Sequence, residues 1–277
     1  MKRLFFILVT ALSLASCRQW VLEDRSDCPS FLFFDITNHD RFERWNDVFL
    51  SVYRHPSNRL ISEAMSTVSA IQDKEFYFTV READAVSGYG LLGYESLKKD
   101  NETWSIPLGA DCSPLFRFSY AENTQEESFI IPVEFTKEHS HITVQFVGYQ
   151  NYITSGGVFP FSIVVRSNTC GLNALTGVPT RGAFEYTPQE TSEARYEFNL
   201  PRQGDNQLIL ELFGKEGFPT GQGHLRTFNL YNILLEKGGL TWTEKNLPDV
   251  SITIDYEETT ITVDVSPWEG SALNYEY

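Results

Sequence analysis

Short segments in which apolar and polar residues alternate recur along this chain, and they restrict its fold more than any other feature. In the second half, Ile142, Val144 and Phe146 alternate with polar residues, and the same period marks 161–165, 196–200, 208–212, 250–254 and 261–265. Successive side chains of a strand point to opposite faces of a sheet, so each segment predicts a strand with one buried face. The chain has 21 Phe and 13 Tyr but only 2 Met, a mixture typical of half-buried pleated surfaces.

The first half contains apolar or alternating runs that also predict strands, at 31–34, 48–53, 75–80, 89–94, 104–107, 115–120 and 128–135. The stretch 63–72 fits a short helix and a strand equally well. Many short strands separated by turns, without a sustained helical period, indicate β-sandwiches. Charges and a turn interrupt the strands between 132 and 139. We therefore predict an all-β protein of two tandem sandwiches, covering residues 28–136 and 137–277.

The N-terminal segment has a different character. Met1-Lys2-Arg3 precedes an uncharged, mostly apolar run that ends in Leu14-Ala15-Ser16-Cys17. A basic start, a short apolar stretch and small residues before a cleavage point are typical of a secretory signal peptide, and the run is too short to span a bilayer. The final tetrapeptide is the pattern of a bacterial lipobox. We predict a signal peptide at 1–16, lipidation of Cys17 and a lipidated tether at 17–27. The alternative is cleavage elsewhere, with Cys17 as an ordinary thiol.

The charge of the chain excludes some partners. The formal net charge is −15, and it becomes −17 when Lys2 and Arg3 leave with the signal peptide. Nucleic-acid binding requires a basic footprint, so we expect no nucleic-acid partner. Electrostatic docking on anionic headgroups is disfavoured for the same reason, which leaves the lipid on Cys17 as the membrane anchor.

Three cysteines follow Cys17 in the sequence, at Cys28, Cys112 and Cys170. Outside the cytoplasm, three thiols permit at most one intramolecular disulfide and one leftover thiol. Their spacing matches no zinc motif. We expect a disulfide between Cys28 and Cys112, because both fall in the predicted N-terminal sandwich, although sequence alone does not fix the pairing.

Two histidines lie close enough in sequence to suggest a metal site. His139 and His141 share one face of a predicted strand, whereas Glu138 points to the opposite face. A metal needs a convergent set of ligands. We therefore interpret the histidines as part of an ordinary solvated strand and predict no metal site.

Three acidic residues, Asp255, Glu257 and Glu258, cluster at the tip of a predicted hairpin. Paired carboxylates serve as acid and base in some enzymes. They are also ordinary in an exposed turn, and nothing in the sequence indicates an enclosing cleft. The chain has no G-x-S-x-G elbow, P-loop or H-E-x-x-H motif. We predict a protein that is not an enzyme, with no catalytic residue and no cofactor.

Several segments together resemble a known family. The family resemblance rests on Glu23-Asp24-Arg25-Ser26-Asp27-Cys28-Pro29, Phe198-Asn199-Leu200-Pro201-Arg202, Leu240-Thr241-Trp242-Thr243, Leu247-Pro248-Asp249-Val250, Ile254-Asp255-Tyr256 and Trp268. In this order, and with the lipobox before them, these segments are similar to those of fimbrial anchor and accessory lipoproteins of Gram-negative anaerobes. Each motif alone is unspecific, and the stretches 82–101 and 168–181 match nothing in the family.

The resemblance implies two transthyretin-like β-sandwich domains. It also implies a surface-exposed outer-membrane lipoprotein at one end of a fimbrium, joined to fimbrillin subunits by β-strand complementation. A close variant is a tip adhesin, and a different class is a surface lipoprotein that binds glycans. A flat aromatic platform on a loop would favour glycan binding, whereas an open groove along a sheet edge would favour the fimbrial role.

Overall fold

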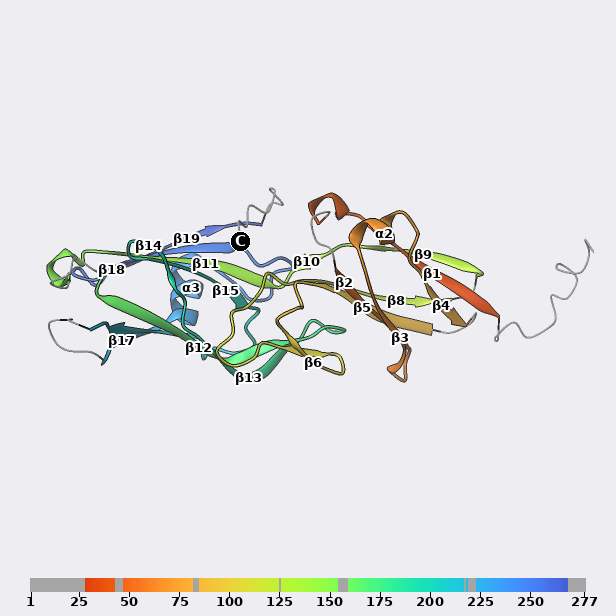
Figure 1. Ribbon diagram of the computed structural model, residues 1–277, viewed down its shortest axis with the longest axis horizontal. Helices are drawn as coiled ribbons and strands as arrows, with labels where there is room; N and C mark the ends of the chain where they lie inside the picture. The colour runs from red at the N-terminus through yellow and green to blue at the C-terminus, as the bar shows by residue number, and fades with distance from the viewer. Residues whose placement is uncertain are drawn as a thin grey trace, which may run out of the picture.

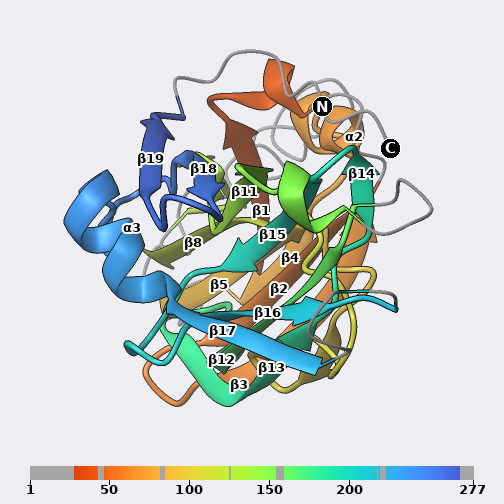
Figure 2. The same cartoon turned by 90° about the vertical axis from the view of Figure 1, so that its left-hand side faces the viewer.

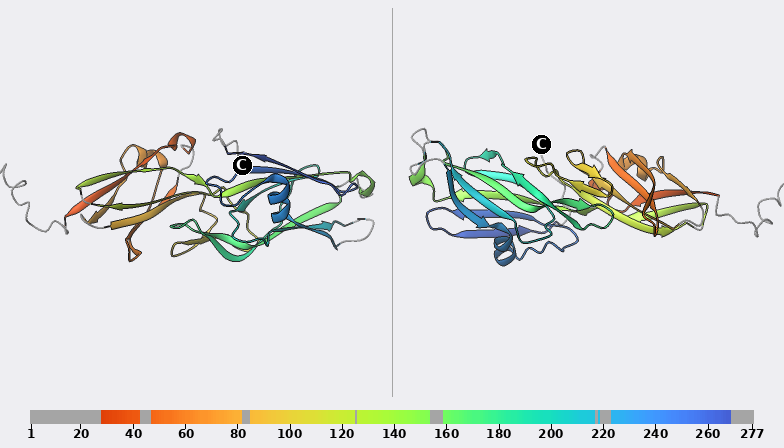
Figure 3. Two further views of the ribbon diagram at one scale, coloured as in Figure 1. Left: turned by 180° about the vertical axis from the view of Figure 1, so that it is seen from behind. Right: turned by 90° about the horizontal axis from the view of Figure 1, so that it is seen from below.

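Two β-sandwiches lie end to end along the long axis of the molecule (Figures 1 and 3). The computed structural model describes residues 28–42, 47–81, 85–124, 126–153, 159–216, 218 and 223–268. The prediction of an all-β chain with two sandwiches is confirmed. In the described part of the chain, no helix is long and apolar enough to cross a bilayer.

The N-terminal sandwich packs a three-stranded sheet against a five-stranded sheet. The first sheet has the order β4 (Phe78–Arg81), β1 (Pro29–Ile36) and β9 (Ser128–Val133). The second has the order β10 (Thr136–Lys137), β8 (Phe116–Asn123), β5 (Ala85–Leu92), β2 (Val48–Arg54) and β3 (Arg59–Ser66). The strand β1 runs antiparallel to β4 and parallel to β9.

The C-terminal sandwich is formed by a five-stranded and a six-stranded sheet. The first has the order β14 (Glu190–Ser192), β15 (Arg195–Pro201), β11 (His139–Val147), β18 (Asp249–Asp255) and β19 (Ile261–Ser266). The other contains β17 (Gly223–Asn229), β16 (Ile209–Gly214), β12 (Phe161–Asn173), β7 (Thr103–Ser105) and β6 (Lys98–Asp100), with β13 (Pro179–Tyr186) paired to β12.

The described helices are short. They are η1 (His39–Arg41), α2 (Val68–Gln72), η2 (Gln150–Tyr152) and α3 (Leu230–Gly238). The helix α3 lies beside β19 and β17 at one side of the C-terminal sandwich (Figure 2). Its N-terminus is capped by the side chain of Asn229, and its C-terminus ends at Gly239, which has a left-handed φ of 67°. Glycine adopts this conformation at low cost, so the sequence ends the helix at this position.

Alternation along β1 shows how the sequence forms the N-terminal core. Leu32, Phe34 and Ile36 point inward and are fully buried, whereas Phe31 and Phe33 on the other face remain partly exposed. The ring of Phe34 contacts that of Tyr120 at a centroid distance of 5.1 Å in an edge-on arrangement. Burial of such side chains stabilises the fold by about 1.5–3 kcal/mol each.

The two sandwiches are interlocked rather than joined by a single crossing of the chain. After β5, the chain leaves the N-terminal sandwich and forms the hairpin β6–β7, which pairs with β12 of the C-terminal sheet, before it returns in β8. A junction cluster fills the space between the sandwiches and contains Phe49, Tyr53, Tyr89, Leu91, Trp104, Leu115, Leu172 and Ala174. Within it, the Nε1–H of Trp104 donates a 3.1 Å hydrogen bond to the hydroxyl of Tyr89. A single domain boundary at residue 136 does not account for β6 and β7, which come before that residue but belong to a sheet of the C-terminal sandwich.

The strands expected from alternation are present. The stretch 63–72, which fitted both a helix and a strand, contains both: β3 ends at Ser66, and α2 begins at Val68. The hydroxyl of Thr67 accepts a 3.0 Å hydrogen bond from the backbone of Ala70 and caps this helix.

Candidate functional site

The predicted sites on cysteine fall into two groups. Cys17 lies outside the described residues, so its lipidation stays a prediction. Cys28, Cys112 and Cys170 are free thiols, and the expected Cys28–Cys112 disulfide is absent. The physical reason is the interlocked topology: Cys112 is buried in the C-terminal core, whereas Cys28 directly precedes β1 of the N-terminal sandwich. Burial raises the pKa of the Cys112 thiol, which makes it unreactive.

Contrary to the prediction, the two histidines do not lie on a solvated strand face. His139 is fully buried, and its Nδ1 accepts a 3.0 Å hydrogen bond from the backbone of Leu115. His141 is partly buried and lies 3.0 Å from the side-chain oxygen of Asn199. Burial, reinforced by the positive charge of Lys137, holds the pKa of His139 well below its usual value. The domain junction covers the beginning of β11, which alternation alone does not reveal.

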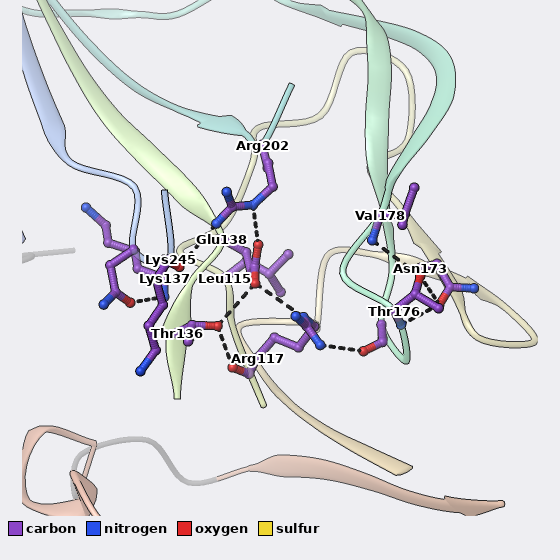
Figure 4. A network of polar contacts seen from close by, with 12 residues as sticks. Leu115, Arg117, Thr136, Lys137, Glu138, Asn173, Thr176, Val178, Arg202 and Lys245 are labelled. Atoms are coloured by element: carbon purple, nitrogen blue, oxygen red, sulfur yellow. Dashed lines mark hydrogen bonds and ion pairs between the residues drawn. The ribbon is translucent and has the colours of Figure 1, made fainter. Parts of the chain in front are cut away.

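Glu138 is the centre of an ion-pair network at the junction (Figure 4). One of its carboxylate oxygens accepts from Arg117 of β8 at 3.2 Å, and the other accepts from Arg202, which follows β15, at 2.6 Å. The Glu138 side chain is 3% exposed. The same arginines reach further, because Arg117 donates to the carbonyl of Ala174 and Arg202 donates to that of Trp242. The network therefore links both sandwiches through one buried carboxylate.

A second buried charge lies next to this network. The side chain of Lys137 is fully buried and forms an ion pair with Asp249 of β18. Burial lowers the pKa of Lys137, while the carboxylate of Asp249 opposes that shift. Only the lysine is buried, since the Asp249 side chain is 36% exposed. Such a pair contributes little net stability compared with apolar packing, but it fixes the relative positions of the elements that carry it. Here it holds β10 of one sandwich beside β18 of the other.

A cleft of about 450 Å³ opens beside Glu138. Its walls come from the junction network and from the loops before β13 and after α3, including Thr176, Val178, Trp242 and Lys245. Trp242 is 7% exposed, so its ring is not a platform for a sugar. The arginines in the cleft wall are paired with Glu138. This arrangement is that of a structural junction, and nothing in it resembles a nucleophile with an orienting base.

The acidic residues Asp255, Glu257 and Glu258 lie at the turn between β18 and β19, as predicted. The carboxylate of Asp255 accepts a 2.9 Å hydrogen bond from the backbone of Glu258 and closes the turn. Glu257 pairs with the side-chain amide of Asn151. Within the described ranges, no three His, Cys, Asp or Glu residues are grouped so that they could hold a metal ion.

The strand β3 forms an exposed edge of the N-terminal sandwich. It pairs with β2 and ends its sheet, and every one of its eight residues is at least partly exposed. In contrast, six of the seven residues of β2 are buried. Leu60 is 46% and Met65 is 67% exposed, whereas Ile61 and Ala64 pack against the N-terminal core. An edge with unpaired backbone groups and apolar side chains is a template for a further strand.

Other edge strands are less open. Pro132 lies within β9 and has no N–H to donate. The edge of β19 is approached by α3, and Lys237 of that helix donates to the carbonyl of Ile261. A register shift near Leu212 and Phe213 disrupts the pairing of β17. Such features protect edges from unwanted pairing. Because β3 combines length with exposed apolar side chains, it is the best candidate for an interaction edge.

Periodicity predicted β3 only in part, in the ambiguous stretch 63–72, and it did not predict β6, β10, β13, β14, β17 or α3. The strand β3 lacks alternation, since an edge strand in which every residue is partly exposed does not need a strict apolar face. For α3, a usable signal existed: Leu230 and Leu234 are four residues apart, and Asn229 and Gly239 are favourable caps.

The fold is similar to that of several solved structures of bacterial proteins. A protein from Bacteroides thetaiotaomicron proposed to bind polysaccharide aligns with a TM-score of 0.60 and 11% identity, over 88% of this chain and 100% of its own. A proposed adhesin from the same organism gives 0.57 and 14%, over 88% and 98%. The fimbrial anchor protein Mfa2 from Porphyromonas gingivalis gives 0.57 and 9%, over 85% and 95%.

No protein-family model matches the sequence, and no curated protein is similar to it at a significant level. The structural similarities extend over nearly the whole of each compared protein, so the two-sandwich architecture is shared in full. At these identities they establish the fold, and the function must be argued from the surfaces of this molecule.

Proposed function

We propose that this protein is an accessory or anchoring subunit of a fimbrium, tethered to the outer membrane through lipid on Cys17 and joined to a fimbrillin by strand addition at β3. The observation that carries the proposal is the exposed edge of β3. The shared architecture with the fimbrial anchor Mfa2 supports it, as does the lipobox at Leu14–Cys17.

Strand addition at this edge has a clear physical basis. An extended segment of fimbrillin aligned with β3 forms ladder hydrogen bonds with its unpaired backbone groups. Apolar side chains of that segment cover Ile61 and Ala64, which are half-buried at the rim of the N-terminal core. Apolar burial contributes about 25 cal/mol per Å². Such a contact depends little on surface charge, so we expect it to resist salt.

The lipid completes the anchor. Two or more acyl chains hold a protein on a membrane far longer than one chain does. In this proposal, the subunit carries the fimbrium on β3 and is itself held by Cys17. It has no nucleic-acid partner, no cofactor and no catalytic role.

The edge assignment is tested by photo-crosslinking from single cysteines in cells that assemble fimbriae. Met65→Cys on β3 is labelled in a Cys28→Ser background, since Cys112 and Cys170 are buried. We expect fimbrillin to be captured from position 65. Leu235→Cys on α3, where the native side chain is 42% exposed, is the matched control and should capture none. Capture from Thr262→Cys on β19 instead would retain strand addition but refute β3 as its edge.

The anchoring role is tested by deletion of the gene. Cells without the protein should release fimbriae into the medium or make longer ones, while fimbrillin synthesis continues. Normal attachment and length of the fimbriae in the deletion strain would refute the proposal. If those cells lose binding to a polysaccharide at the same time, the glycan-binding alternative is correct.

A further inference from the structure

The outer face of the three-stranded sheet carries apolar side chains where polar ones are expected. Phe31 and Phe33 of β1, Tyr77 before β4 and Ile130 of β9 form this outer aromatic patch. Ile130 is 60% and Tyr77 is 47% exposed. The Phe31 and Phe33 rings lie 5.3 Å and 5.4 Å from the Tyr77 ring, and Phe33 is the register partner of Ile130. The patch is therefore one contiguous surface.

The outer aromatic patch is not part of the N-terminal core. The opposite face of β1 supplies Leu32, Phe34 and Ile36 to the N-terminal core, and a sheet with one wet face normally alternates apolar with polar residues. An exposed apolar cluster of this kind indicates a contact with something outside the domain.

The geometry of the patch disfavours a sugar and a free-standing protein partner. The Phe31 and Tyr77 rings are at 88° to one another, and those of Phe33 and Tyr77 are at 47°, so they form no flat stacking platform. A stable protein interface buries about 800 Å² on each partner and involves roughly 20–30 residues of each. Four side chains fall far short of that size. A contact this small persists only if a covalent tether holds the two surfaces close together.

In the proposed function, the segment between the lipidated Cys17 and β1 is such a tether. Pro29, the first residue of β1, lies twelve positions after Cys17 in the sequence. At about 3.3–3.6 Å per residue, a fully extended chain spans at most about 40 Å. The patch begins two residues further along the same strand, in the part of the molecule away from the C-terminal sandwich (Figure 1). A short tether raises the effective concentration to the millimolar range, so even a weak contact is populated.

We infer that the outer aromatic patch contacts the interfacial region of the bilayer that holds the lipidated Cys17. Phe, Tyr and Ile side chains favour the boundary between headgroups and acyl chains, and a Tyr hydroxyl can remain in the polar layer. The inference rests on the proposed lipid anchor. Its consequence is that the N-terminal sandwich has a fixed orientation on the membrane, with β3 in the opposite sheet turned away from the lipid.

The test uses the full-length acylated protein in phosphatidylcholine vesicles that contain a nitroxide-labelled lipid. An environment-sensitive fluorophore is placed on Thr79→Cys in a Cys28→Ser background, because Thr79 is exposed and is the register partner of Phe31. The same fluorophore on Met65→Cys of β3 is the control. We expect severalfold stronger quenching at position 79 than at position 65.

Removing the most exposed apolar side chains should abolish the difference. Tyr77→Ser combined with Ile130→Ser should reduce quenching at position 79 to the value at position 65. Leu108→Ser combined with Val178→Ser changes two apolar residues that are 69% and 59% exposed elsewhere, and it should leave the difference intact. Circular dichroism verifies that each variant is folded.

The possible failures are distinguishable. Mass spectrometry that finds no acyl group on Cys17 overturns both the lipid anchor and this inference. Acylated protein with equal quenching at positions 79 and 65 overturns the membrane contact alone. A fluorophore at position 79 that is shielded in detergent, without quenching in vesicles, identifies a second copy of the chain as the occupant and also overturns it.

Discussion

The substitution Glu138→Gln tests whether the buried network at the junction stabilises the protein. This change retains the size of the side chain but removes the charge that Arg117 and Arg202 share. One amide oxygen can still accept from one arginine, whereas the new NH₂ group faces the N–H donors of the other. Removing one partner of a buried ion pair costs about 3–5 kcal/mol.

The structure places the expected value at the lower end of that range. The Arg117 and Arg202 side chains are 14% and 11% exposed and line the cleft, so water can partly replace the lost carboxylate. We expect a loss of about 3 kcal/mol in the free energy of unfolding. For a chain of this size, 1 kcal/mol corresponds to about 2–4 °C in Tm, so Tm should fall by roughly 6–12 °C.

The assay is urea unfolding with calorimetry, and the matched control is Glu197→Gln. Glu197 pairs with Arg195 on the surface, where the two side chains are 32% and 44% exposed. Exposed pairs contribute at most about 1 kcal/mol, so the control should change stability by no more than about 1 kcal/mol. In a double-mutant cycle, Arg202→Met should cost clearly less in the Glu138→Gln background than in the native protein. If Glu138→Gln is no more destabilising than Glu197→Gln, the network does not stabilise the junction.

Three further predictions follow from the same structure. Burial lowers the pKa of His139 in the folded state, so the unfolded chain binds more protons below about pH 6.5. The free energy of unfolding should therefore fall as the pH drops, by up to about 1.4 kcal/mol per pH unit. In urea unfolding at several pH values, His139→Gln should flatten this dependence, and an unchanged slope would contradict the assignment. Trp104 packs against Phe49 and Tyr89 across the junction, so Trp104→Ala should lower the free energy of unfolding by about 3–5 kcal/mol and split calorimetric unfolding into two transitions. A single transition at the native Tm would refute the idea that Trp104 couples the two sandwiches. Cys17→Ala should abolish fatty-acid labelling and release the protein from membranes, and label that persists in this variant would rule out the lipobox.

Local periodicity predicted most of the core strands because each apolar face is recorded in its own segment. Leu32 and Phe34, or Ile142 and Val144, are buried as their spacing indicates. Contacts that depend on distant segments were not predictable in this way. His139 is buried by the chain around Leu115, and Cys112 joins the C-terminal core through an excursion of the chain. Neither effect has a local signal, so a solvated histidine and a disulfide were the natural but incorrect predictions.

The candidate interaction surfaces show the same limit. Glu138 was assigned to the strand face opposite the histidines, but its partners are Arg117 and Arg202, 21 and 64 residues away in sequence. The strand β3 is functional in our proposal because it lacks a covering neighbour, and only the sheet order reveals that. The outer aromatic patch is visible in the sequence as the run of apolar residues in β1. Its exposure, however, depends on which face of β1 packs against the core.

The arrangement of these surfaces suggests how an anchoring subunit would transmit load. The strands β1 and β3 belong to the two sheets of the N-terminal sandwich. If the proposed function holds, tension between the lipid and fimbrillin would therefore pass through the N-terminal core. Side chains such as Phe34 and Tyr120 join these sheets directly, with their ring centroids 5.1 Å apart. The C-terminal sandwich lies outside that path. Its contacts at Trp104 and Glu138 would then hold the C-terminal sandwich in a fixed orientation relative to the N-terminal one.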